Sequence, residues 1–156
     1  MNDTSIKLLF LILGGLLILS AFFSSSETAM MSLNRYRLKH LKKNNRGAKK
    51  AYKLLARPDK LIGIILIGNN LVNILASAIA TVIAIRLYGD AGIFIATILL
   101  TLVVLIFAEV TPKTVAVLHP EGIAFFSSHI LRPLLVLFYP LVWIVNQVSN
   151  GLLRIF

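Results

Sequence analysis

The sequence predicts an all-α membrane protein with three transmembrane helices, a juxtamembrane interfacial helix and short surface helices on the cytoplasmic side. Three observations lead to this fold class. The chain is 58% hydrophobic and only 14% charged, whereas soluble domains are about 25% charged. Its apolar residues gather into long runs, and 11 of its 16 Lys and Arg residues lie between residues 33 and 60. This composition excludes a disordered chain and an ordinary soluble domain.

The first apolar run, about residues 5–24, is long enough to cross a hydrocarbon core of about 30 Å. A signal peptide has a similar length, but no small-residue cleavage motif follows this run. We therefore predict a retained span that leads directly into the polar stretch Ser24 to Glu27.

Residues 33–60 form a basic segment in which leucines and tyrosines alternate with Lys and Arg. This pattern predicts one or two short helices on the membrane surface, with their apolar side toward lipid and a turn at residues 44–47. The positive-inside rule places the segment in the cytoplasm and the N-terminus outside. We expect it to contact anionic membrane lipids, and we expect no nucleic acid partner.

Two further spans are predicted at about residues 61–85 and 91–111, joined outside the cell by the short polar turn 86–90. The last apolar segment, about residues 131–155, contains Pro133 and Pro140, and its uninterrupted part is short for a span. We expect it to be a juxtamembrane helix at the cytoplasmic interface, which makes the C-terminus cytoplasmic. The alternative is a fourth, kinked crossing, because membrane helices tolerate proline.

The first motif with chemical potential is Ser20, Ser24 and Glu27. Their i, i+4 and i+7 spacing places two hydroxyls and a carboxylate on one helical face. However, Ser24 and Glu27 also match a capping box, which could start a second helix at this point. The two interpretations are compatible, because a break here would free carbonyl oxygens inside the membrane, as at the cation sites of transporters.

The second motif places three carboxamides in one span. Asn69, Asn70 and Asn73 follow Gly68, and Asn69 and Asn73 share a helical face. Asparagines in membrane helices often form hydrogen bonds between helices. Three of them beside a glycine, which admits a neighbouring backbone, favour a buried polar site.

The third motif is Glu109-Val110-Thr111-Pro112-Lys113. Pro112 has no N–H, so it frees the carbonyl oxygen of Ala108 next to the Glu109 carboxylate. A carboxylate within a span costs roughly 2.5–3.5 kcal/mol on insertion scales and is a functional hypothesis by default. The alternative is an interfacial Glu109 paired with Lys113, one helical turn away.

These motifs offer only oxygen ligands, because the chain has no cysteine and no histidine lies within the three predicted spans. Oxygen ligation selects hard cations such as Mg²⁺, Ca²⁺, Na⁺ or Mn²⁺. One or two carboxylates with neutral oxygens suit Mg²⁺ or Na⁺ better than a Ca²⁺ cage. An intramembrane enzyme that uses Glu27 and Glu109 lacks an evident nucleophile and base, so we expect no enzymatic activity.

Three motifs, occurring in order, resemble the transmembrane domain of the CorC/CNNM magnesium transporter family. They are residues 20–29, from Ser20 through Ser24 to Ala29, residues 67–73, from Ile67 to Asn73, and residues 109–113, from Glu109 to Lys113. The resemblance covers essentially the whole chain, residues 1–156, as one domain. It implies three spans plus a juxtamembrane helix, a homodimer in the plasma membrane, and Na⁺-coupled export of Mg²⁺. The alternative is a membrane-embedded Mg²⁺ sensor or scaffold that binds the ion without moving it.

The resemblance also implies where Mg²⁺ binds. The implied ligands are Ser20, Ser24, the backbone at Gly68, Asn70 and Glu109. Implied neighbours, or parts of the Na⁺ site, are Ser25, Glu27, Asn69, Asn73, Ala108, Thr111 and Pro112. Members of this family usually continue into cytoplasmic CBS domains, which we expect in the full-length protein and which are absent from this chain.

Overall fold

The computed structural model describes residues 3–156, which are helical almost throughout and contain no strand. In chain order the elements are α1 (Asp3–Ser32), α2 (Arg35–Leu41), α3 (Arg46–Leu55), α4 (Pro58–Tyr88), the 3₁₀ turn η1 (Gly89–Ala91), α5 (Gly92–Val103), the π-helix η2 (Val104–Val110), α6 (Thr111–Leu118), α7 (Pro120–Leu137) and α8 (Tyr139–Ile155). The predicted all-α membrane fold class is confirmed.

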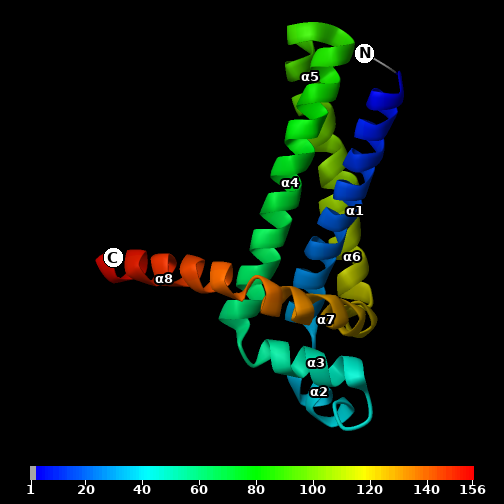
Figure 1. The fold of residues 1–156 in the computed structure, drawn as a ribbon. Helices are drawn as coiled ribbons and strands as arrows, with labels where there is room; N and C mark the ends of the chain where they lie inside the picture. The colour runs from blue at the N-terminus through cyan, green and yellow to red at the C-terminus, as the bar shows by residue number, and fades with distance from the viewer. Residues whose placement is uncertain (1–2) are drawn as a thin grey trace.

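Three long apolar helical segments form the body of the molecule, and we call them the legs. They are α1, α4 and the continuous chain α5–η2–α6. Two helical segments are long and apolar enough to cross a membrane, Ser5–Ser32 and the 61-residue Pro58–Leu118. The second segment turns back at η1, where Gly89 has a φ of 70°, a conformation that glycine adopts without steric cost. As a result α4 and the α5–η2–α6 chain run antiparallel beside α1 (Figure 1).

The first leg is one unbroken helix that ends at Ser32, so the alternative of a second helix starting at Ser24 is wrong. The hydroxyls of Ser25 and Ser26 donate to the carbonyl oxygen of Phe22 at 3.0 and 2.6 Å. These serines therefore bond back along the same helix, where a cap would require extended backbone at Ser24. A helix break does not free carbonyl oxygens in this leg.

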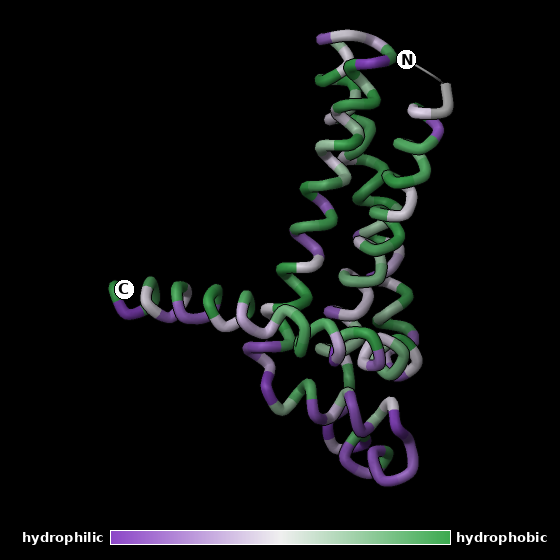
Figure 2. The backbone as a smooth tube through the Cα atoms, in the orientation of Figure 1, coloured by the Kyte–Doolittle hydropathy of each residue, from purple (hydrophilic) through white to green (hydrophobic). Residues whose placement is uncertain are grey.

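The α2–α3 pair has the predicted turn but a different environment. Asn45 caps α3 by accepting a hydrogen bond from the Ala48 N–H at 3.2 Å. The prediction that the apolar side faces lipid is wrong, because Leu38, Ala51 and Leu54 are buried inside the protein. Helix α7 lies between this pair and the legs and covers it (Figure 1), which leaves a hydrophilic outer surface (Figure 2).

The last part of the chain is two helices. The predicted single helix over residues 131–155 is instead the end of α7 followed by α8, with a bend of 79° between them at Phe138. Pro140 lies in the first turn of α8, where its missing N–H costs little. Both helices lie across the lower end of the legs (Figure 1), and taken together they are apolar enough to count as one bent membrane segment.

Buried hydroxyls join α7 to its neighbours. The Ser127 hydroxyl donates to the Ser26 hydroxyl oxygen at 2.8 Å, because the Ser26 proton is used on the Phe22 carbonyl oxygen, and this bond links α1 to α7. The Ser128 hydroxyl donates to the Phe125 carbonyl oxygen within α7 at 2.7 Å and also lies 3.2 Å from the Gly47 carbonyl oxygen, which places α7 against α3. Since all three serine side chains are fully buried, each hydrogen bond satisfies a group that water cannot reach.

We expect Gly47→Ala to lower the free energy of unfolding by about 1–3 kcal/mol, the usual cost of overpacking. A methyl group at Gly47 would lie 2.7 Å from the Cβ of Phe125 on α7. Gly122→Ala is the matched control, because nothing lies within 4 Å of that added Cβ and alanine favours helix. Thermal unfolding in detergent measures both variants, and equal midpoints would contradict close α3–α7 packing.

Candidate functional site

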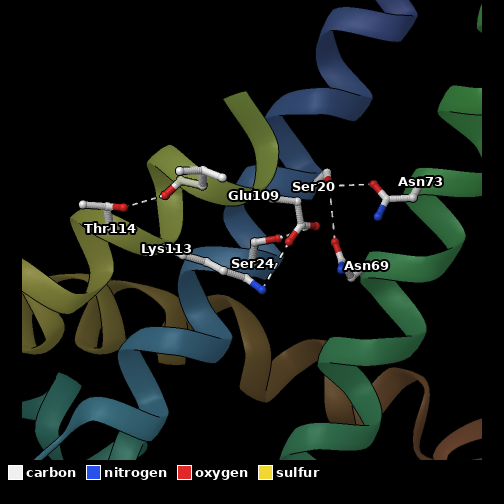
Figure 3. Close-up of polar contacts among 8 residues, drawn as sticks. Ser20, Ser24, Asn69, Asn73, Glu109, Lys113 and Thr114 are labelled. Atoms are coloured by element: carbon white, nitrogen blue, oxygen red, sulfur yellow. Dashed lines mark hydrogen bonds and ion pairs between the residues drawn. The ribbon is translucent and has the colours of Figure 1, made fainter. Parts of the chain in front are cut away.

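The three sequence motifs meet where the legs pack together. Helix α1 carries Ser20 and Ser24 one turn apart, and both are fully buried. Helix α4 carries Asn69 and Asn73, also one turn apart and half-buried, and η2 carries Glu109. Residues four apart share a helical face, so each leg presents its polar groups to the same region (Figure 3).

Ser20 joins α1 to α4. Its hydroxyl oxygen lies 2.6 Å from the side-chain oxygen of Asn73 and 3.3 Å from that of Asn69. A serine hydroxyl has a single proton, so it can donate fully to only one of these two oxygens at a time. The Ser20 hydroxyl and two carboxamides therefore meet between α1 and α4, and oxygens of these kinds can bind a hard cation.

Ser24 joins α1 to the third leg. Its hydroxyl donates to Glu109 Oε1 at 3.2 Å, and the other carboxylate oxygen lies 3.2 Å from Lys113 Nζ. The ion pair that the sequence offered as the alternative for Glu109 is therefore present, together with a contact to the serine motif. The Glu109 side chain is 26% exposed, so its charge is partly shielded from water and held by two partners (Figure 3).

The backbone around Glu109 departs from α-helix as the position of Pro112 suggests. Residues 104–110 form a π-helix, and the Thr111 N–H donates to the Ile106 carbonyl oxygen five residues back. Pro112 provides no N–H for the Ala108 carbonyl oxygen, which removes one α-helical bond from this turn. Short π-helical stretches occur often at functional sites, and this one carries the carboxylate.

Two predicted ligands, Gly68 and Asn70, are the chain neighbours of Asn69 but take no part in the side-chain hydrogen bonds of this cluster within residues 3–156. Asn70 is exposed on α4, and within residues 3–156 it makes no side-chain hydrogen bond; Asn69 and Asn73 contact Ser20 in its place. The space beside Gly68 is filled by the ring of Phe23, which a Cβ at this position would overlap. The shared face of Asn69 and Asn73 was visible in the sequence, whereas no sequence signal pairs Phe23 with Gly68.

The predicted neighbours are distributed around the cluster. Ala108 is fully buried beside α1, and Ser25 bonds to its own helix. Thr111 is exposed and Pro112 half-buried. Glu27 is half-buried one turn from Ser24, and within the described range it forms no ion pair.

The cluster has the chemistry of a site for a hard cation. Among residues 3–156, no three His, Cys, Asp or Glu side chains come together, so a metal ion here would rely on one carboxylate and neutral oxygens. Two hydroxyls, two carboxamides and one carboxylate come from three separate helical segments. Such oxygen sets bind Mg²⁺, Ca²⁺ or Na⁺ in preference to Zn²⁺ or copper.

The fold and the cluster define the class of protein: an all-α, multi-leg membrane domain with an oxygen-lined polar cluster between its legs. The family model of the cyclin M (CNNM) transmembrane N-terminal domain matches residues 11–156, and the chain belongs to this family. The family resemblance drawn from the three sequence motifs is therefore confirmed.

Several curated proteins are similar to the chain. An UPF0053 protein of Haemophilus influenzae is 59% identical over 156 residues, covering 99% of this chain and 37% of that protein. The UPF0053 inner membrane protein YfjD of Escherichia coli is 60% identical over 137 residues, covering 87% and 32%. A polyamine export protein of Haemophilus influenzae is 30% identical over 155 residues, covering 90% and 36%. The chain spans about a third of the length of these relatives.

Proposed function

We propose that this domain binds Mg²⁺ between its three legs and exports it across the plasma membrane, driven by Na⁺, as a homodimer. The observation that carries the proposal is the convergence of the Ser20, Asn69 and Asn73 oxygens one helical turn from the Ser24–Glu109 contact. Membership of the CNNM family supports a membrane transport role.

The cluster suits Mg²⁺ because its oxygens come from different legs. Mg²⁺ requires a near-octahedral set of oxygens at about 2.0–2.1 Å and gives up water reluctantly. Ser20, Ser24, Asn69, Asn73 and Glu109 together supply six side-chain oxygens, two of them from the Glu109 carboxylate. A bound ion would hold α1, α4 and η2 together, and its release would let the legs separate, which couples ion binding to the arrangement of the legs.

Lys113 is the group that a cation must replace. Its ammonium group lies 3.2 Å from Glu109 and its side chain is 45% exposed, so it can swing into water when a cation arrives. While no cation is bound, the ion pair compensates the Glu109 charge, which lowers the cost of placing a carboxylate within the membrane.

A second candidate substrate is a polyamine. Two relatives, from Salmonella typhimurium and Haemophilus influenzae, are named polyamine export proteins. The Glu109–Lys113 ion pair favours this candidate, because it shows that an alkylammonium group fits against the carboxylate. The cluster offers one such carboxylate, and its neutral oxygens favour the small cation.

We expect Glu109→Gln to weaken Mg²⁺ binding by roughly 10- to 100-fold, because a charged ligand is lost. Asn69→Ala should weaken it by about 3- to 10-fold, the effect of one neutral contact. Asn44→Ala is the matched control, because Asn44 is exposed in the turn between α2 and α3, outside the three motifs, and should bind Mg²⁺ as the parent does. Titration calorimetry on purified protein measures the affinities.

The same variants distinguish the candidate functions in vesicles. Mg²⁺ efflux that requires a Na⁺ gradient and is lost in Glu109→Gln supports export. Mg²⁺ binding without flux would overturn export and leave the sensor or scaffold function. Glu109-dependent efflux of putrescine, with no movement of Mg²⁺, would favour the polyamine.

We expect Lys113→Gln to bind Mg²⁺ about 3- to 10-fold more tightly, because the competing ammonium group is removed from Glu109. Lys49→Gln is the matched control, since Lys49 is an exposed basic residue on α3. Calorimetry at low and high salt measures the Mg²⁺ affinity of both variants. High salt screens the effect of overall charge, so a gain in affinity that persists there comes from removing the Lys113 ammonium group from Glu109. Weaker binding in Lys113→Gln would contradict the proposed competition.

We propose that the α2–α3 pair is cytoplasmic and that the η1 turn is outside. The chain has no cysteine, so single cysteines can be placed without background. A membrane-impermeant maleimide added to intact cells should label Asp90→Cys and should label Asn44→Cys only after permeabilisation. The reverse pattern would contradict this orientation.

A further inference from the structure

A polar cavity of about 210 Å³ lies at the corner between the start of α4 and helix α8. The first turn of α4 contributes Asp59 and Lys60, and Arg57, the residue just before the helix, contributes a second cation. Helix α8 contributes aromatic and carboxamide side chains, including Trp143 and Asn146. None of these residues belongs to the cluster around Glu109.

The cavity lies at the level of the membrane interface. Along α8, Tyr139, Trp143, Asn146 and Asn150 recur at i, i+4, i+7 and i+11, so they share one helical face. The opposite face is apolar and exposed (Figure 2). A helix of this kind that lies across the legs (Figure 1) rests in the interface, with its polar face among lipid headgroups.

The charges in the cavity suit a zwitterion. Lys60 Nζ donates to the Tyr139 hydroxyl at 3.3 Å and lies 4.5 Å from the centre of its ring. Arg57 and Asp59 are exposed, and within residues 3–156 Asp59 forms no ion pair. Two cations can hold a phosphate, and the nearby carboxylate can hold an ammonium group.

Next to the cavity, the exposed surface of α4 becomes apolar in the direction that leads away from Asp59 along the helix. Asp59, Ile62 and Leu66 recur at i, i+3 and i+7, so they lie on one face of α4. Ile62 and Leu66 are 36% and 43% exposed. A polar headgroup at Asp59 would therefore have its acyl chains beside Ile62 and Leu66.

We propose that this cavity binds the headgroup of an aminophospholipid, with its phosphate at Arg57 and Lys60 and its ammonium group at Asp59. The aromatic side chains Tyr139 and Trp143 pack beside the headgroup, as is usual at membrane interfaces. This binding site is independent of any transported ion.

Trp143 provides the test, because it is the single tryptophan of the chain and it lines the cavity. The protein is reconstituted in phosphatidylcholine vesicles that contain increasing fractions of brominated phosphatidylethanolamine, phosphatidylglycerol or phosphatidylcholine. Brominated acyl chains quench a neighbouring tryptophan. We expect phosphatidylethanolamine to bind about two- to fivefold more tightly than phosphatidylcholine, as a few exposed ion pairs allow.

Variants test whether the preference for phosphatidylethanolamine depends on the residues that line the cavity. The double change Arg57→Gln and Lys60→Gln should abolish it, and Asp59→Asn should shift it toward phosphatidylglycerol. Lys53→Gln is the matched control, because Lys53 is an exposed cation on α3 outside this cavity. Circular dichroism and thermal unfolding confirm that each variant is folded.

A soluble competitor separates the lipid from a free phosphate compound. Phosphoethanolamine in solution should leave the quenching nearly unchanged, because it lacks the acyl chains. If it instead abolishes the lipid preference at low millimolar concentration, the cavity takes a soluble phosphate compound and the lipid proposal is overturned. Equal quenching by all three brominated lipids would also overturn it.

Discussion

The polar cluster depends on the close approach of α1 and α4 at Gly68. The ring of Phe23 occupies the space that any larger residue at position 68 would fill, and Phe23 is itself buried. This contact lies beside Ser20 and Asn69, and it sets the separation at which hydroxyl and carboxamide oxygens meet.

Helix α7 separates the three long apolar legs from the basic α2–α3 pair. Its buried serines bond to α1 on one side and to α3 on the other, and Glu121 pairs with Arg37 on α2. These contacts hold the α2–α3 pair on the side of α7 that faces away from the legs. Electrostatic attraction between the basic surface of this pair and anionic lipid acts over distance and is screened by salt.

Much of the fold could be predicted from local features. The length and composition of the apolar runs indicate the legs, Gly89 and its neighbours indicate the turn, and Asn45 lies where a helix cap is favoured. The remaining features depend on contacts between segments far apart in sequence. The apolar sides of α2 and α3 suit lipid and protein equally well, so only the position of α7 decides between them.

The candidate site shows the same limit. The three motifs and their oxygen chemistry could be found from spacing and residue type, and the pairing of Glu109 with Lys113 was one of two alternatives. The sequence does not determine which asparagine faces α1, because Asn69, Asn70 and Asn73 all lie within about one helical turn. The rotation of α4 is set by the packing of Phe23 on Gly68, which no local pattern encodes.

The position of the Glu109 carboxylate depends on the hydrogen-bond register of the π-helix η2 that carries it. In a π-helix each N–H bonds to the carbonyl oxygen five residues back, whereas in an α-helix it bonds to the one four residues back. A shift of that register along η2 would rotate a side chain by about 100° while leaving the ends of the leg in place. The Glu109 carboxylate therefore lies on a π-helical stretch, η2, whose hydrogen-bond register can change while the third leg stays helical.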